Sequence, residues 1–527
     1  MKSDKKSILI LFIIYTIANV FFLINYNGIY WDDWELYDQE YDAVLQMFLQ
    51  AAGNLGYINT PIRYIIANSG DIGIFLSRVL IFSFIFFSGI FIFKILARLT
   101  FISKLERMFV VLFFIIAPLN SAKIALINFQ SNLRICIFFF AFYLLSKYLV
   151  DEKGKIGFRI LLLCLFFISF GTNSVLVFYA IVLLYIFYIT YSYENSVLKN
   201  IYTFIKTKID FILLPIIFFV IKSIYFVPSG LSEGYNKINL NNIINLKLYF
   251  QTFQSNFIVP IQISFFSMSS VIIILILLLL LLSNLFTRQN NEMHKKDVYL
   301  FILGLVIFFL GAFPYIAVGK TPSLGDWASR FQLLLPLGFS FILYYGIQIS
   351  SNLLNFKEIV KYFVYLILII SFIMFHMKEQ IKYNIDWYYQ KSIIENFKTN
   401  DLIIKNNTFI INNKIKKNLA QNRYVRFYEF NGMSREAFGK DDKFFVNSEK
   451  ELRRYSSYKN RKQMNFYTWN ENEKIYFTIK DNSNLFNQKS IRKNIKYLFR
   501  LKYLELFKPL EFKKEISNLI SIEFTEK

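Results

Sequence analysis

The stretch "SILILFIIYTIANVFFLINYNGIYWDDWELYDQEYD", residues 7–42, joins a long apolar run to a cluster of acids and aromatic rings. Its first part, residues 8–25, contains no charged side chain. About 20 apolar residues suffice to cross the hydrocarbon core of a bilayer. The whole chain is 55% hydrophobic and 19% aromatic, and runs such as "VIIILILLLLLL" at 271–282 exceed what a soluble core needs. The sequence therefore predicts a polytopic α-helical membrane protein.

Hydropathy divides the chain into a membrane module, residues 1–376, and a tail, residues 377–527. In the module we expect about eleven transmembrane helices, near residues 8–25, 72–97, 108–122, 124–149, 158–171, 174–191, 209–227, 262–286, 298–316, 331–350 and 360–376. In the tail, "NTFIINN" and "KIYFTIK" alternate like strands, and "RKNIKYLFRLKYLELF" has the period of an amphipathic helix. The tail is predicted to be a small α+β domain.

The net charge of +23 is not arranged for a nucleic-acid partner. Of the 59 Lys and Arg residues, 28 lie in residues 1–376, and 31 are scattered through the tail among 18 acids. Mixed charge of this density is typical of a solvated surface beside anionic lipid headgroups. We expect membrane lipids as partners and no nucleic acid.

The orientation follows from the basic residues near the ends of the predicted spans. With the N-terminus inside, the inner face carries 19 Lys and Arg, against 7 at the outer face before the tail. Because basic residues favour the cytoplasmic side, the chain is predicted to cross the cell membrane with a cytoplasmic N-terminus. An odd number of spans places the tail outside, as an extracytoplasmic domain, and the acidic stretch behind the first span also lies outside.

The acidic stretch contains the first candidate site. Asp32 and Asp33 stand between Trp31 and Trp34, and Tyr37 follows. Two neighbouring carboxylates at an interface suit a general base, a metal site or an ion-binding site. The simpler interpretation is an acidic, aromatic collar where the chain leaves the membrane.

A second candidate is Arg78, which lies several residues inside the second apolar run. An arginine within a membrane is costly and usually faces a cavity or an anionic partner. Asp71 lies seven residues earlier, two helical turns away on the same face, so a structural ion pair is one explanation. The phosphate of a lipid is the other.

Several short motifs follow in order. Pro61 to Tyr64 forms a Pro-x-x-Tyr segment, "GDIGIFLSR" leads to Arg78, "FFIIAPLN" ends a span at Pro118, and "SRFQLLLPLGFSFILYY" opens another after Arg330. Over roughly residues 8–350 this pattern resembles the GT-C integral-membrane glycosyltransferases. The closest likeness is to the branch of protein O-mannosyltransferases and lipid A aminoarabinose transferases.

The resemblance implies an inverting glycosyltransferase whose donor is a polyprenyl-phosphate-linked sugar and whose acceptor is an envelope glycan, lipid or protein. It places the catalytic base in the first outer loop, where Asp33 is the first candidate and Asp32 the second. It also implies that buried arginines bind the donor phosphate. A carboxylate has suitable basicity for this role, and the guanidinium fork matches phosphate oxygens.

Two sets of residues are therefore candidates for binding. Those for the donor phosphate are Arg78, Arg330, Arg134 and Lys320. Those for the sugar or acceptor are Trp31, Trp34, Tyr37, Asp326 and Trp327. The acid that often opens the fourth span in the family is replaced here by Asn132 and Arg134, so a divalent metal has poor support and no cofactor is predicted. Arg134 has an alternative role as a snorkelling interfacial residue.

Other classes of protein share parts of this pattern. An O-antigen-type polysaccharide polymerase or a flippase also has many spans and outer arginines, but needs no carboxylate pair behind its first helix. A secondary transporter would suit Arg78, yet the hydropathy shows no clear inverted repeat. A structural scaffold gives no reason for Arg78.

Overall fold

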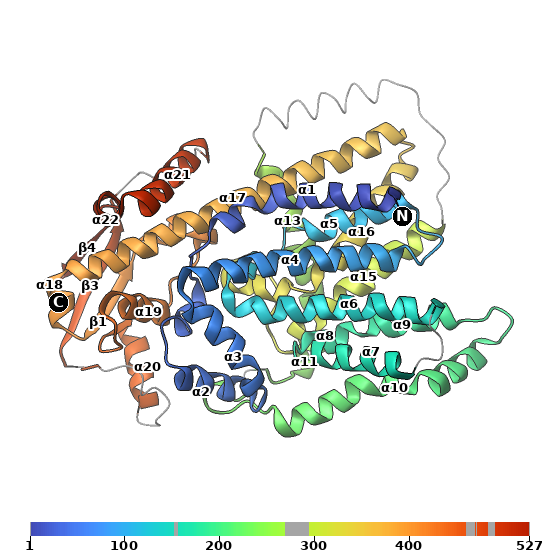
Figure 1. Ribbon diagram of the computed structural model, residues 1–527, viewed down its shortest axis with the longest axis horizontal. Coiled ribbons are helices and arrows are strands. Elements are labelled where there is room, and N and C mark those ends of the chain that lie inside the picture. The colour runs from blue at the N-terminus through green and yellow to red at the C-terminus, as the bar shows by residue number, and fades with distance from the viewer. Residues whose placement is uncertain are drawn as a thin grey trace.

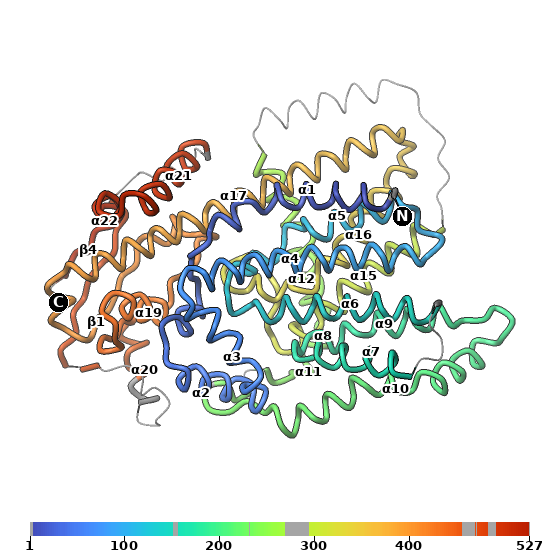
Figure 2. The backbone as a smooth tube through the Cα atoms, viewed as in Figure 1, coloured from blue at the N-terminus to red at the C-terminus, as the bar shows by residue number. Residues whose placement is uncertain are grey.

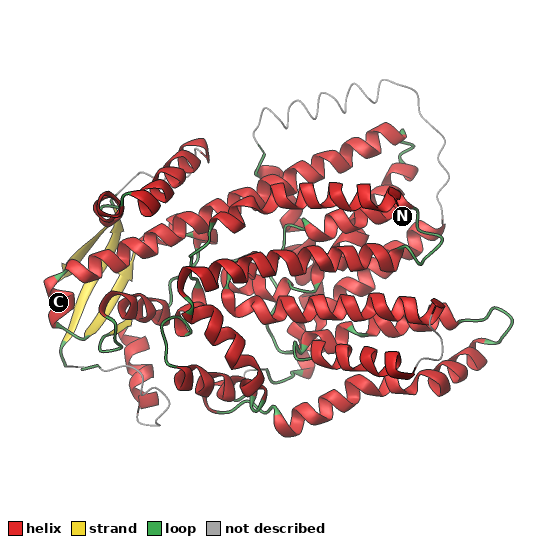
Figure 3. Ribbon diagram, in the orientation of Figure 1, coloured by secondary structure: helices red, strands yellow, loops and turns green. Residues whose placement is uncertain are grey.

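The computed structural model describes residues 2–151, 156–234, 236–268, 295–459, 469–470, 472–482 and 491–525. Most of these residues are helical, and the strands gather at one end of the molecule, beyond the helical bundle (Figure 1 and Figure 3). The bundle contains α1 (Lys2–Ile24), α4 (Gly70–Leu96), α5 (Lys104–Ile115), α6 (Phe129–Asp151), α7 (Ile156–Ser169), α8 (Ser174–Phe178), α9 (Ala180–Thr190), α10 (Val197–Tyr225), α13 (Val259–Phe266), α15 (Lys295–Ala317), α16 (Leu335–Leu353) and the first part of α17 (Glu358–Thr399).

Short helices connect the long ones. They are η1 (Trp31–Glu35), α2 (Tyr41–Ala52), α3 (Leu55–Asn68), η2 (Ser121–Ile124), η3 (Leu126–Asn128), η4 (Gly230–Ser232), α11 (Leu240–Ile243), α12 (Leu246–Phe253), η5 (Gln254–Ile258) and η6 (Asp326–Gln332). Two of them, η1 and η6, carry the aspartates and tryptophans of the candidate site.

Five helices of the described chain are long and apolar enough to cross a membrane, as expected of a membrane protein. They are Asp4–Ile24, Gly70–Leu96, Leu126–Val150, Lys295–Ala317 and Glu358–Thr399. A sixth candidate is the pair η6 and α16, which is bent by 74°. The other predicted spans coincide with shorter or kinked helices, and the span at 262–286 lies outside the described residues beyond 268. The predicted number of eleven is therefore not confirmed.

Helix α17 joins the bundle to the tail. Its 42 residues run beside α1 and continue to the sheet (Figure 2). At 1.5 Å per residue this helix is about 63 Å long, twice the thickness of the hydrocarbon core. The predicted boundary between residues 376 and 377 falls inside this unbroken helix, because the polar residues that follow the apolar run retain helical propensity and pack against the tail.

The tail forms a four-stranded sheet in the order β2 (Phe444–Val446), β1 (Thr408–Asn413), β3 (Lys474–Asp481) and β4 (Ile520–Thr525). Strand β1 runs parallel to both neighbours, with Phe409 opposite Phe445 and Ile475, and β4 is antiparallel to β3. The end of α17 covers the sheet, since Phe397 stacks on Phe445 at 4.8 Å between ring centroids. The two strands predicted from the sequence are present.

Helices and turns complete the tail. They are α18 (Asp401–Lys405), η7 (Ile415–Asn418), η8 (Ala420–Asn422), α19 (Phe427–Phe438), α20 (Glu449–Lys459), α21 (Ile491–Phe507) and α22 (Pro509–Ser517). The amphipathic helix predicted from the sequence is α21. Helix α19 packs directly on η1, so the tail contacts the first loop of the chain.

The orientation can be tested with single cysteines in a background where Cys136 and Cys164 are replaced by Ala. Exposed Glu40 precedes α2 and exposed Lys440 follows α19, and both helices lie toward the end of the molecule that carries the sheet. The segment between α9 and α10, which contains exposed Tyr193, lies at the opposite end (Figure 1). Glu40→Cys and Lys440→Cys are expected to react with an impermeant thiol reagent in intact cells, and Tyr193→Cys only after lysis. Labelling of Tyr193→Cys alone in intact cells would reverse the predicted orientation.

Candidate functional site

The two adjacent aspartates of η1 have different surroundings. Asp33 is fully buried, whereas the side chain of Asp32 is 25% exposed. The turn begins at Trp31, whose φ of 52° is unusual for a bulky residue. Backbone conformations of this kind persist only where the surroundings enforce them, and they cluster at functional sites.

Asp33 connects the loop behind α1 to the loop that precedes α6. Its Oδ2 accepts hydrogen bonds from the backbone N–H groups of Leu126 (2.9 Å) and Tyr30 (3.3 Å), and its Oδ1 accepts one from Ile127 (2.9 Å). Burial raises the pKa of Asp33 to about 7, against the opposing effect of these N–H groups and of Arg78. A pKa near 7 would suit a base, but both oxygens face backbone donors inside the fold. This geometry does not favour the predicted role of Asp33 as the base.

Asp32 faces a different set of groups. Its Oδ1 accepts a hydrogen bond from the Tyr428 hydroxyl at 2.7 Å. Its Oδ2 accepts one from Trp327 Nε1 at 3.2 Å and lies 3.5 Å from the Arg330 guanidinium. Side-chain donors from η6 and α19 therefore orient a partly exposed carboxylate, and of the two aspartates Asp32 is the one that solvent and substrate can reach.

Two tryptophans predicted to contact substrate lie against each other beside Asp32. Trp31 and Trp327 stack with ring centroids 4.8 Å apart, and Trp31 Nε1 donates a hydrogen bond to Asp326 at 2.8 Å. The Arg330 guanidinium lies over the Trp327 ring at 4.4 Å. Asp326, like Trp31, has a positive φ, of 46°. The structure thus brings the acidic stretch together with the loop before α16, as the motifs predict.

The tail supplies residues that the sequence did not indicate. Arg426 donates a hydrogen bond to the Tyr428 hydroxyl at 3.0 Å and lies 3.5 Å from Asp326. Behind them, fully buried Arg423 pairs with Asp386 of α17 at 2.6 Å and with Glu429 of α19. These residues carry no recognisable motif, and the sequence predicts the tail to be a separate domain.

The Glu429 carboxylate connects this buried pair to η1. Its Oε2, which contacts Arg423, also accepts a hydrogen bond from the backbone N–H of Trp31 at 3.2 Å. Its Oε1 accepts one from the backbone N–H of Arg426 at 3.0 Å. One buried ionic network therefore holds the long helix, the tail and the acidic loop in a fixed arrangement.

The four predicted phosphate ligands divide into two pairs. Arg330 and Lys320 both lie in the segment between α15 and α16. Burial, together with the positive charge of Arg330, lowers the pKa of Lys320 to about 8. Lys320 Nζ also donates a hydrogen bond to Asn236 at 2.8 Å. Of the two cations, Arg330 is the one that contacts Asp32, at 3.5 Å.

The other two predicted ligands are directed into the fold. Arg78 is fully buried and donates hydrogen bonds to the carbonyl oxygens of Ile124 (2.8 Å) and Gly28. Arg134 donates to the Gly171 carbonyl (2.9 Å) and to Asn59 Oδ1 (2.6 Å). The ion pair considered for Arg78 with Asp71 is not formed among the described contacts. Both arginines connect loops and helices, so their geometry does not favour a phosphate contact.

Trp34 and Tyr37 belong to the interface with the tail. Trp34 Nε1 donates a hydrogen bond to Gln390 of α17 at 2.7 Å, and a side chain at Gly432 of α19 would approach Trp34 Cβ to 2.7 Å. The Tyr37 ring packs edge-on against Trp34, and its carbonyl accepts a hydrogen bond from Arg435 at 2.6 Å. Neither residue is brought next to Asp32.

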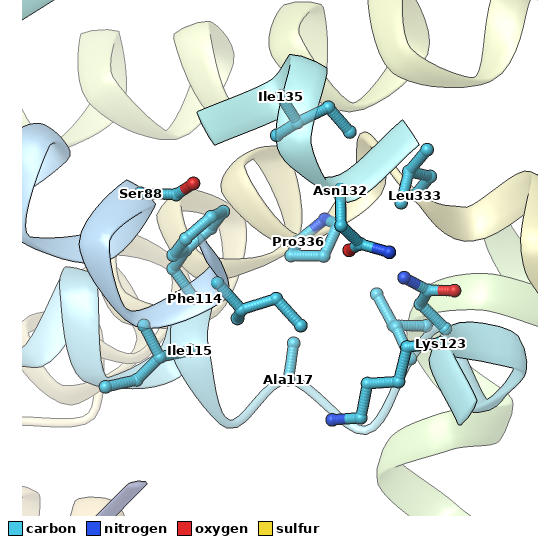
Figure 4. A pocket seen from close by; sticks show the side chains of 12 residues that line it. Ser88, Phe114, Ile115, Ala117, Lys123, Asn132, Ile135, Leu333 and Pro336 are labelled. Carbon is cyan, nitrogen blue, oxygen red and sulfur yellow. The ribbon is translucent and has the colours of Figure 1, made fainter. Parts of the chain in front are cut away.

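A small cavity lies among α4, α5, α6 and the start of α16 (Figure 4). Ser88, Phe114, Asn132 and Pro336 line it, and its volume of about 50 Å³ is far below the 300 to 1000 Å³ of typical small-molecule pockets. Lys123, at its edge, donates a hydrogen bond to Asn19 at 3.0 Å. The cavity is too small for a sugar.

The described residues contain no group of three or more His, Cys, Asp or Glu side chains placed to hold a metal ion. Comparisons with protein-family models, with curated proteins and with solved structures find no match for this chain. The resemblance to the GT-C enzymes therefore rests on the sequence motifs alone.

Replacing Asp33 by Asn is expected to destabilise the protein. The amide has one oxygen and one NH₂ group, so at least one of the three backbone N–H donors would face another donor. A buried donor without a partner costs about 1 to 3 kcal/mol. Thermal unfolding of the purified protein in detergent measures the change, with Asp42→Asn, an exposed acid of the same stretch, as the control. Equal unfolding temperatures for Asp33→Asn and Asp42→Asn would contradict the anchoring role.

Proposed function

We propose that this protein is an inverting membrane glycosyltransferase. It transfers a sugar from a polyprenyl-phosphate-linked donor to an envelope glycan, lipid or protein at the outer face of the cell membrane. The observation that carries the proposal is the partly exposed carboxylate of Asp32, which lies beside the stacked Trp31 and Trp327 rings and 3.5 Å from the Arg330 guanidinium.

Asp32 replaces Asp33 as the proposed catalytic base. It accepts the proton from the acceptor hydroxyl while that oxygen attacks the anomeric carbon of the donor sugar. The bond between this carbon and the phosphate oxygen breaks, and the lipid phosphate leaves with the electron pair. Trp327 and Tyr428 hold the carboxylate in position through hydrogen bonds of 3.2 and 2.7 Å, which is the orientation that general-base catalysis requires.

Arg330 and Lys320 are the proposed ligands of the donor phosphate. Arg330 is packed between the Trp327 and Phe331 rings, at 4.4 and 4.9 Å from their centroids. This packing fixes the plane of a guanidinium that matches phosphate oxygens. A cation here also stabilises the negative charge that grows on the leaving phosphate.

Donor binding is expected to weaken as the pH rises through about 8. The pKa of Lys320 is lowered to about 8, so its ammonium is intact near pH 6.5 and lost near pH 9, while a phosphodiester stays ionised throughout. Donor affinity measured from pH 6 to 9.5 should fall across this range in the native protein. In Lys320→Arg it should stay level, because a guanidinium keeps its charge. If donor affinity still falls around pH 8 in Lys320→Arg, the titration of Lys320 is not the cause of that fall.

The function is tested by transfer in reconstituted vesicles. The purified protein receives a panel of polyprenyl-phosphate sugars that differ in the sugar, and extracted envelope material serves as acceptor. Release of polyprenyl phosphate with labelling of the acceptor is the expected result. Absence of both binding and release across the whole panel would refute the proposal.

A further inference from the structure

A second cavity lies where α17 leaves the apolar part of the bundle. Its volume is about 420 Å³, within the range of pockets that bind small molecules. It is formed by α13, α17, the turns η7 and η8, and the start of α21. Helix α13 packs against α17, next to α1 in Figure 1. None of the residues proposed for catalysis lines it.

One wall of this cavity is cationic. Lys378, Lys382 and Lys417 contribute to its lining. Lys378 is the first charged residue after a stretch of α17, residues 362–377, that contains no Lys, Arg, Asp or Glu. Lysines in this position lie at the level of lipid headgroups, where their ammonium groups meet phosphates.

Apolar side chains also line the cavity. They are Ile263 of α13 and Phe375, Ile381 and Ile385 of α17, the last three on the same helix as Lys378 and Lys382. Apolar and cationic side chains in one cavity match a molecule that has a hydrocarbon chain and an anionic head.

Three buried oxygens in the lining of the cavity place a second requirement on its ligand. Glu379 Oε2, Gln421 Oε1 and Asn494 Oδ1 have no hydrogen-bond partner among the described residues, and Glu379 and Asn494 are 9% and 7% exposed. A buried acceptor without a partner costs about 1 to 3 kcal/mol. Phosphate oxygens cannot satisfy these acceptors, but hydroxyl groups can.

We propose that this cavity binds the headgroup of a phosphorylated lipid that carries hydroxyl groups. The lysines bind the phosphate, the three oxygens accept hydrogen bonds from the hydroxyls, and the chain lies along α13 and α17. Two sources have this chemistry, namely a bilayer lipid such as phosphatidylglycerol and a sugar linked to polyprenyl phosphate. The inference does not depend on transfer at Asp32.

The full-length protein in detergent is titrated with phosphatidylglycerol, phosphatidic acid or phosphatidylcholine, and bound lipid is measured by native mass spectrometry. Lys378→Gln combined with Lys382→Gln is expected to weaken phosphatidylglycerol binding at least about tenfold, the effect of losing one charge-assisted hydrogen bond. The matched control is Lys398→Gln. Lys398 lies on the same helix and pairs with Glu395 as Lys382 pairs with Glu379, at 3.1 and 2.9 Å.

A third variant, Asn494→Leu, tests the hydroxyl requirement. It removes an unpaired acceptor and keeps the branching of the side chain. Asn494→Leu should weaken the binding of phosphatidylglycerol but not that of phosphatidic acid, because the phosphate of phosphatidic acid carries no further hydroxyl-bearing group. Equal binding of phosphatidylcholine and phosphatidylglycerol, or native affinity in the double lysine variant, would overturn the proposal.

A competition experiment identifies which of the two lipids occupies the cavity. Displacement of phosphatidylglycerol by a polyprenyl-phosphate hexose at lower concentration identifies the cavity as a donor site. If phosphatidylglycerol stays bound in the presence of the polyprenyl-phosphate hexose, the cavity is a bilayer-lipid site. Both results support the ligand class. Because these experiments measure lipid binding, their results can be interpreted even if the protein shows no transfer activity.

Discussion

Asp32→Asn is expected to lower the rate of sugar transfer by about 10² to 10⁴, the usual contribution of a general base. The amide is nearly isosteric with the carboxylate and keeps an oxygen for the Tyr428 hydroxyl or for Trp327, but it cannot take a proton from the acceptor. Asp32 is partly exposed, so folding should change little. The measurement is the single-turnover rate with donor bound, which separates chemistry from binding.

Two comparisons make this result specific to Asp32. Asp42→Asn removes an exposed acid from the same stretch and should transfer at the native rate. Tyr428→Phe removes one hydrogen bond to Asp32 while the carboxylate stays, so its loss should be smaller than that of Asp32→Asn. Native rates in Asp32→Asn would refute the base assignment.

Arg423→Met is expected to reduce the free energy of unfolding by about 3 to 5 kcal/mol. Arg423, Asp386 and Glu429 are fully buried, and removal of one partner leaves uncompensated buried charge. Unfolding in denaturant, followed by tryptophan fluorescence, measures the loss, since the Arg423 guanidinium lies 5.6 Å from the Trp31 ring centroid.

Surface and compensated variants serve as controls for Arg423→Met. Arg500 pairs with Glu515 while 63% exposed, so Arg500→Met should change stability by less than about 1 kcal/mol. Adding Asp386→Asn and Glu429→Gln to Arg423→Met should recover part of the loss, because the buried charges disappear together. If Arg423→Met and Arg500→Met are equally stable, the buried network is not what holds the tail to η1.

Much of the fold could be predicted from the sequence, because membrane burial leaves a strong compositional signal. The apolar helices, the two strands and the amphipathic helix of the tail follow from hydropathy and periodicity. The number of spans is not confirmed, since several apolar windows of the described chain form helices that are shorter or kinked. The predicted domain boundary at 376 lies inside α17, because a loss of hydrophobicity does not end a helix.

The site could be predicted only in part. The resemblance assigns the acidic stretch, Trp327 and Arg330 to one site, and the structure places Trp327 and Arg330 beside Asp32. The separate roles of Asp32 and Asp33 did not, since they depend on backbone N–H groups at Leu126 and Ile127, over 90 residues later in the chain. Arg78 was recognised as buried, but only the structure reveals its carbonyl partners. Tyr428 stands in a tail whose composition gives no sign that it reaches the first loop.

The contact between η1 and α19 has a consequence for biogenesis. Residues 31–35 are synthesised about 390 residues before residues 423–429, and the helices α2 to α17 lie between them in the chain. During translation Asp32 therefore has no Tyr428 beside it until α19 has been made. The surroundings of Asp32 are completed only after the helices between the two segments have been synthesised.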